Sequence, residues 1–106
     1  MKKLAAALAM AGIAGIAAAP ASAQSPDDLL KKYACLSCHA VDKKLVGPSY
    51  KDVAAKYRGQ GGADKMLAEK IKKGGQGVWG PIPMPPNAGV SDADLKVLVS
   101  YILSVK

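Results

Sequence analysis

The sequence predicts an all-α domain of about four short helices wrapped around a bound group. Apolar residues recur at helical spacing in separate stretches of residues 26–106, and no alternating run of β-branched residues predicts a strand. Both cysteines and the only histidine lie within residues 35–39. Because so small a chain has a limited core of its own, we expect the group held by these side chains to supplement it.

Residues 1–23 are typical of a secretory signal peptide, so residues 24–106 are predicted to form the working domain, in the periplasm. Lys2 and Lys3 precede an apolar run over 4–19, and Ala21-Ser22-Ala23 supplies the small-residue cleavage pattern. The alternative is an uncleaved membrane anchor, which needs about 20 strongly apolar residues. The run is shorter and mostly alanine, which favours cleavage and no stable membrane insertion.

The chain is basic. It carries 15 Lys and Arg residues against 8 Asp and Glu residues, and without Lys2 and Lys3 the count of 13 against 8 leaves a net charge of +5. A basic surface suits nucleic acid, an anionic membrane or an acidic protein. The secretory signal disfavours nucleic acid, and no aromatic residues alternate with the lysines to stack bases. We therefore predict no nucleic-acid partner and place most lysines on solvated helix faces.

The first helix is predicted over Pro26–Cys38. Ser25 is a typical N-cap, proline suits the first helical position, and the Asp-Asp pair that follows is favoured by the helix dipole. The apolar side of this helix holds Leu29, Leu30 and Tyr33.

Three further helices are predicted. Two short ones cover 50–57 and 63–73, and each is followed by glycines that end it. The last helix begins at Ser91, which together with Asp94 three residues later resembles a capping box. Its apolar residues repeat at i, i+3, i+4 and i+7: Leu95, Leu98, Val99 and Ile102.

Cys35, Cys38 and His39 carry the chemistry of this sequence. Helix positions three and four apart emerge on roughly one side, so all three side chains can grip one object. C-x-x-C-H is the attachment signature of c-type haem, in which two thiols form thioethers and the adjacent histidine reaches the iron. The sequence therefore predicts one covalently attached haem c, with its iron, per chain.

Three other uses of this cluster fit the sequence less well. A structural zinc site needs four ligands, and the chain has no further Cys or His to complete them. A thioredoxin-like redox pair normally sits in a βαβ context, and the strands are missing. A disulfide across four residues would close almost no loop and would restrict the unfolded chain little.

Met84 is the predicted second axial ligand of the iron. It lies in the stretch 77–87, whose prolines exclude a helix or a central strand and leave a rigid loop. The prolines also reduce the freedom that is lost when the loop closes over the haem. Met66 adjoins Leu67 on a predicted helix and is expected to fill a gap in the core. The alternative for Met84 is a loop residue that packs on apolar neighbours.

Four stretches resemble the small bacterial monohaem class I cytochromes c of the c-551 and c-552 type: CLSCHA, VGPSYKDVAAKY, QGVWGPIPMPPNAGVSDADL and the closing helix. The resemblance spans nearly all of residues 24–106. It implies the class I cytochrome c fold, in which the first and last helices cross and the haem sits edge-on in the middle. It also implies thioether bonds from Cys35 and Cys38, with His39 as the proximal and Met84 as the distal ligand.

The resemblance implies roles for three more residues. Pro48 would offer its carbonyl to the other nitrogen of His39, in agreement with the rule that a metal-bound histidine usually has such an acceptor. Trp79 would bond a haem propionate, although by itself it equally suits a core aromatic. Asn87 would steady the sulfur of the distal ligand. Lys70 departs from the group, in which an arginine is often aimed at a propionate, because lysine offers a point charge without the fork geometry.

The expected function is electron transfer rather than catalysis. With His39 and Met84 both bound, the iron has no open position, and a Met/His pair raises the reduction potential. The resemblance implies donation to a nitrite reductase or a terminal oxidase, with a respiratory complex or another redox protein as donor, by a monomeric carrier. The alternative is a haem sensor or small peroxidase-like enzyme in which Met84 leaves the iron, but no distal histidine or arginine is available to assist it.

A carrier must expose a haem edge to its partner. Val46, Gly47, Ile82, Pro83 and Pro85 flank the predicted ligands and would contact that partner, with lysines around them steering an acidic protein. The alternative is that these loops only pack onto the haem.

Overall fold

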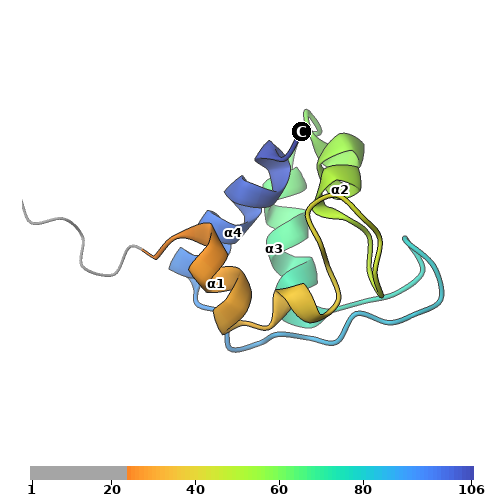
Figure 1. The fold of residues 1–106 in the computed structure, drawn as a ribbon. Coiled ribbons are helices and arrows are strands. Elements are labelled where there is room, and N and C mark those ends of the chain that lie inside the picture. The colour runs from red at the N-terminus through yellow and green to blue at the C-terminus, as the bar shows by residue number, and fades with distance from the viewer. Residues whose placement is uncertain (1–23) are drawn as a thin grey trace, which may run out of the picture.

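The computed structural model describes residues 24–106, which form four α-helices and one turn of 3-10 helix. In chain order these are α1 (Pro26–Lys32), η1 (Cys35–Ser37), α2 (Tyr50–Tyr57), α3 (Ala63–Lys73) and α4 (Asp92–Ser104). No strand forms within these residues, where only isolated bridges pair His39 with Lys44 and Gly75 with Met84. The all-α prediction is confirmed (Figure 1). The predicted signal peptide, residues 1–23, lies outside the described residues.

Local sequence signals place the helix starts. Ser25, Ser49 and Ser91 are the N-caps of α1, α2 and α4, and each hydroxyl accepts a hydrogen bond from the backbone N–H three residues later, at 3.2, 3.0 and 3.1 Å. α3 instead follows Gly62, which has a φ of +81°. None of the helices in residues 24–106 has the length and apolar character needed to cross a bilayer.

The first predicted helix is wrong in its second half, because it stops at the end of α1 instead of continuing to Cys38. Ala34 adopts a left-handed conformation with φ +58° and ψ +27°, which costs about 1–2 kcal/mol, and the chain then resumes as η1. The Tyr33 carbonyl, no longer needed by a helix, accepts a hydrogen bond of 3.0 Å from the Asn87 side chain. Because these two residues lie 54 positions apart, local sequence cannot reveal this break.

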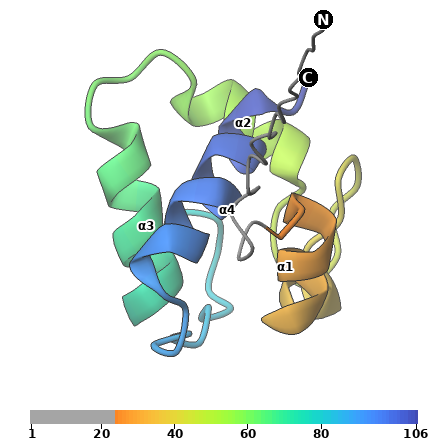
Figure 2. The same cartoon turned by 90° about the vertical axis from the view of Figure 1, so that its left-hand side faces the viewer.

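α4 is the centre of the packing and lies against α1, α2 and α3 (Figure 2). All four apolar residues that the periodicity assigns to its inner face are buried. One core cluster draws on all four helices and on Val90, and its largest fully buried side chains are Leu29, Leu30, Leu98 and Val90. At the C-terminal end of α4, the Arg58 guanidinium donates to the carbonyls of Leu103 and Val105, which ties this end to α2.

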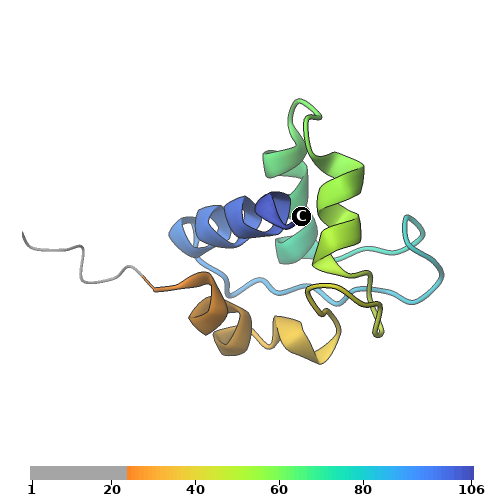
Figure 3. The ribbon, with the colours of Figure 1, turned by 45° about the horizontal axis from the view of Figure 1, so that its top comes forward.

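Residues 74–91 form the long connection between α3 and α4. Figures 1 and 3 show this segment leaving the helices, turning, and returning to the start of α4 beside α1. No side chain between residues 75 and 89 is buried. Apart from Val90 near its end, the connection therefore adds no buried side chain to the core.

Candidate functional site

A cavity of about 410 Å³ lies between η1, α2, α3 and the long connection. Its walls are mainly apolar, and its volume is in the range that ligand and cofactor sites occupy. A porphyrin is flat and largely apolar, so the donor set and the walls both fit a haem. All seven residues predicted to bind the cofactor line this cavity: Cys35, Cys38, His39, Pro48, Trp79, Met84 and Asn87.

Cys35 and Cys38 stand on one turn of the chain. Cys35 begins η1, and the Cys38 N–H donates to the Cys35 carbonyl at 3.2 Å. Both are free, half-buried thiols, and burial raises the pKa of the Cys35 thiol. No group of three or more Cys, His, Asp or Glu side chains in residues 24–106 is placed to hold a metal ion by itself. Two free thiols on one turn suit attachment of a prosthetic group.

The imidazole of His39 is held in one orientation. Its Nδ1 lies 2.8 Å from the Pro48 carbonyl oxygen. A carbonyl can only accept, so Nδ1 carries the proton and Nε2 keeps its lone pair for a metal. Gly47 allows this approach, because a Cβ there would lie 2.6 Å from the His39 Cε1. The Gly47 N–H also donates to the Cys38 carbonyl at 2.8 Å, which fixes the loop against the turn that carries Cys35 and Cys38.

Tyr50, which the sequence reasoning missed, lies beneath the histidine. Its ring stacks on His39 with a centroid separation of 5.2 Å and an interplanar angle of 25°. Tyr101 meets Tyr50 edge-on at 6.2 Å. Burial raises the pKa of the Tyr50 phenol far above its ordinary value, so the ring stays neutral. Nothing in the local sequence distinguishes this tyrosine from any other at the start of a helix.

Met84 is placed through its backbone. Its N–H donates to the Gly75 carbonyl at 2.7 Å, and the Gly75 N–H donates to the Met84 carbonyl at 3.0 Å. Gly74, with a φ of +72°, lies so near that a Cβ there would collide with the Met84 carbonyl oxygen. Gly74 and Gly75, which end α3, thus let the segment around Met84 approach this helix. The Met84 side chain is partly buried and packs against the core.

Trp79 and Lys70 both line the cavity. The Trp79 side chain is 40% exposed, so it is not a core aromatic. Its ring meets Tyr57 edge-on at 6.4 Å, and the Lys56 Nζ lies 5.8 Å from its centroid. Lys70 also lines the cavity from α3. A bond from Trp79 to a propionate stays a prediction.

Asn87 is held through both its backbone and its side chain. Its backbone N–H donates to the Ile71 carbonyl at 2.9 Å, and its Nδ2 donates to the Tyr33 carbonyl at 3.0 Å. An amide nitrogen carries two N–H groups, so the bond to Tyr33 leaves one for the sulfur of Met84. That contact also stays a prediction.

Comparison with known proteins identifies the class that this fold and site define. Residues 27–106 match the family model described as cytochrome c. The chain belongs to the cytochrome c family. More narrowly, it is a small class I monohaem cytochrome c of the c-551 and c-552 type.

The relatives named here cover most of the chain. Cytochrome c-551 of Pseudomonas aeruginosa is 58% identical over 84 residues, which are 79% of this chain and 80% of the relative. Cytochrome c-552 of Nitrosomonas europaea is 56% identical over 84 residues, 79% and 82% of the two chains. The crystal structure of wild-type Nitrosomonas europaea cytochrome c552 superposes with a TM-score of 0.73 and covers 76% of this chain and 99% of that one.

Membership of this family has two consequences for the chain. It carries a covalently bound haem c with iron, so the cofactor predicted from C-x-x-C-H is confirmed. Cytochromes c are electron-transfer proteins, so the chain is an electron carrier and not an enzyme.

Proposed function

We propose that the chain is a periplasmic one-electron carrier whose haem is attached through Cys35 and Cys38 and whose iron is ligated by His39 and Met84. The orientation of His39 carries this proposal. With Nδ1 held 2.8 Å from the Pro48 carbonyl, Nε2 is the nitrogen left for the iron. Cys35, Cys38, His39 and Met84 all line the same cavity.

The polypeptide holds both proposed ligands in place, so they need not move when the iron changes its oxidation state. When bound, the haem supplies a one-electron ferric/ferrous couple. His39 is restrained by Pro48 and stacked on Tyr50, and Met84 is restrained by two backbone hydrogen bonds to Gly75. Ligands held in this way keep one geometry in both oxidation states, which is what fast electron transfer requires.

The surroundings of the cavity favour a carrier over a sensor or a peroxidase-like enzyme. A peroxidase-like site would use a distal histidine or arginine to assist peroxide chemistry. His39 is the only histidine in the sequence, and Arg58, the only arginine, bonds to carbonyls at the end of α4 instead of lining the cavity.

Partners and location are extensions of the same proposal. The signal peptide predicted over residues 1–23 supports a periplasmic location, and the resemblance to the c-551 and c-552 group supports donation to a nitrite reductase or a terminal oxidase. Val46 and Ile82 line the cavity and are 49% and 60% exposed, so they are available for docking at the haem edge. The surrounding lysines would then steer an acidic partner.

The ligation is tested by exchanging each methionine of residues 24–106 in the holoprotein. Met84→Ala should abolish the near-red absorption of Met-bound ferric iron and lower the reduction potential by on the order of 0.1 V, since axial ligands tune it strongly. Met66→Ala is the matched control, because Met66 is partly buried at the same cavity but lies on α3, and it should keep both features. An unchanged spectrum in Met84→Ala would refute the proposed distal ligand.

A further inference from the structure

Tyr33 connects three parts of the molecule that are distant in sequence. It follows the last residue of α1, and the left-handed Ala34 after it turns the chain into η1. Its carbonyl accepts from the Asn87 side chain at 3.0 Å, and its hydroxyl reaches Asp94 in the first turn of α4. The residue thus lies next to the turn that carries Cys35 and Cys38, and it bonds both to the segment that follows Met84 and to the last helix.

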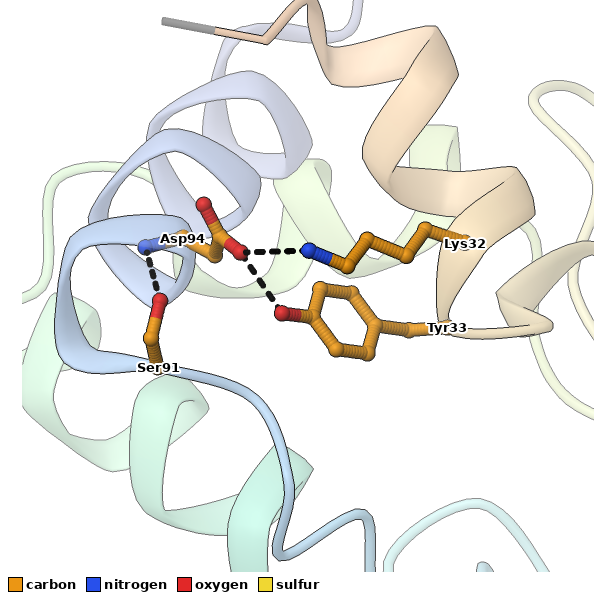
Figure 4. Close-up of polar contacts among 4 residues, drawn as sticks. All are labelled: Lys32, Tyr33, Ser91 and Asp94. Atoms are coloured by element: carbon orange, nitrogen blue, oxygen red, sulfur yellow. Dashed lines mark hydrogen bonds and ion pairs between the residues drawn. The ribbon is translucent and has the colours of Figure 1, made fainter. Parts of the chain in front are cut away.

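The hydroxyl contact is short and shielded from solvent. Tyr33 Oη donates to Asp94 Oδ2 at 2.6 Å, a length typical of a charge-assisted O–H···O⁻ bond (Figure 4). The Asp94 side chain is only 17% exposed, and its backbone N–H is held by Ser91 Oγ at 3.1 Å. The Asp94 carboxylate points at Tyr33. It does not complete the predicted capping box with Ser91.

Lys32 belongs to the same cluster but contributes less. Its Nζ lies 3.8 Å from Asp94 Oδ2 and 5.2 Å from the centroid of the Tyr33 ring. Its side chain is 52% exposed, so water screens both contacts. The Tyr33–Asp94 bond is therefore the part of the cluster that can hold the backbone in place.

Asn87 relays this restraint toward Met84. Only Pro85 and Pro86 separate the two residues, and their rings fix φ near −65°, so the short link is stiff. Asn87 is fixed at its other side by its N–H bond to the Ile71 carbonyl. With both backbones held, a shift of the Tyr33 carbonyl frees the Asn87 side-chain amide, the group predicted to steady the Met84 sulfur.

We propose that Tyr33 and Asp94 are positioning residues for the distal ligand: their hydrogen bond holds the Tyr33 carbonyl where it anchors Asn87, and this keeps the Met84 sulfur on the iron. This inference rests on the proposed ligation by Met84. If the hydrogen bond only joined α1 to α4, its loss would lower stability without favouring release of the sulfur.

The test is a titration of the ferric holoprotein with imidazole, which binds the iron only where Met84 has left it. The apparent affinity for imidazole then reports the fraction of molecules with Met84 released. Tyr33→Phe removes the hydroxyl and keeps the ring, and Asp94→Asn removes the charge and keeps the shape. We expect each to raise the apparent affinity about tenfold, in line with the loss of one charge-assisted hydrogen bond.

Two control variants separate positioning from stability. Arg58→Ala removes the bonds to the Leu103 and Val105 carbonyls at the other end of α4, so it should lower the melting temperature without changing imidazole affinity. Lys32→Ala removes the exposed member of the cluster and should leave the affinity unchanged.

The outcomes are distinct. A rise for Tyr33→Phe and Asp94→Asn that exceeds any rise for Arg58→Ala at a similar loss of stability supports the inference. Equal affinities across these variants and the unmodified chain overturn it, while Met84→Ala still alters the spectrum. If Met84→Ala leaves the spectrum unchanged, the proposed ligation fails first, and this inference fails with it.

Discussion

The helical core and the two segments that border the cavity, residues 36–48 and 74–91, are stabilised in different ways. In the core, apolar side chains of α1 to α4 bury one another. In residues 36–48 and 75–89 no side chain is buried, and these two segments hold every large apolar side chain that is exposed in the described part of the chain: Leu36, Val41, Leu45, Val46, Val78, Trp79 and Ile82.

This difference shows what each region relies on. The helices rely on the hydrophobic effect within the polypeptide. The cavity segments rely on backbone hydrogen bonds, on glycines that permit close approach, and on rigid prolines, as at Gly47 and in the Gly75–Met84 bridge. Four of these exposed apolar side chains line the cavity, so the cofactor is the natural partner of this part of the molecule: Val46, Val78, Trp79 and Ile82.

Removal of both cysteines proposed to attach the haem should have the largest effect on stability. Cys35→Ala/Cys38→Ala is expected to leave a largely unfolded chain, because a core from about 83 residues is marginal without the haem. Far-UV circular dichroism and thermal melting measure the outcome. Ser37→Ala, which lies between the two cysteines and keeps both thiols, is the control and should fold as the unmodified protein does. A cooperative melt of the double variant would show that the helical core suffices.

A pair of truncations should give an intermediate effect that separates the two regions. Leu98→Ala in the holoprotein should lower the free energy of unfolding by about 2–5 kcal/mol, since Leu98 is fully buried. Ile82→Ala should change it by no more than about 0.5 kcal/mol, since Ile82 is 60% exposed. Denaturant unfolding measures both. Similar losses would mean that the cavity segments share the core, contrary to the comparison.

The smallest effect concerns the lysines on the cavity segments, residues 36–48 and 74–91, and the rate of electron transfer. Electron transfer to an acidic redox protein should slow several-fold as ionic strength rises from about 0.01 to 0.1 M, because the Debye length falls from about 30 to 10 Å. Lys44→Gln, next to the exposed Leu45 and Val46, should slow the reaction at low salt. Lys96→Gln is the control, because it removes the same charge from α4, outside residues 36–48 and 74–91. Rates independent of salt would remove electrostatic steering.

The sequence predicted a large part of the fold and of the candidate site. The serine caps of α1 and α4 and the apolar periodicity of α4 depend on neighbours within one or two turns, so the linear pattern contained them. The same holds for C-x-x-C-H, whose spacing is itself the signal. Asp94 marks the limit: a capping box is the nearest interpretation of its spacing, yet its carboxylate binds Tyr33, 61 residues away.

The chain's order of residues alone therefore determined the kind of cofactor and the number of α-helices, because each follows from short-range chemistry. Tertiary structure decided that α1 ends before the cysteines, that Tyr50 stacks on His39, and that Asn87 is anchored by Tyr33. These features depend on groups that become neighbours only when the helices and the loop segments pack together. No local pattern encodes such distances, because the energy that fixes them is shared among distant parts of the fold.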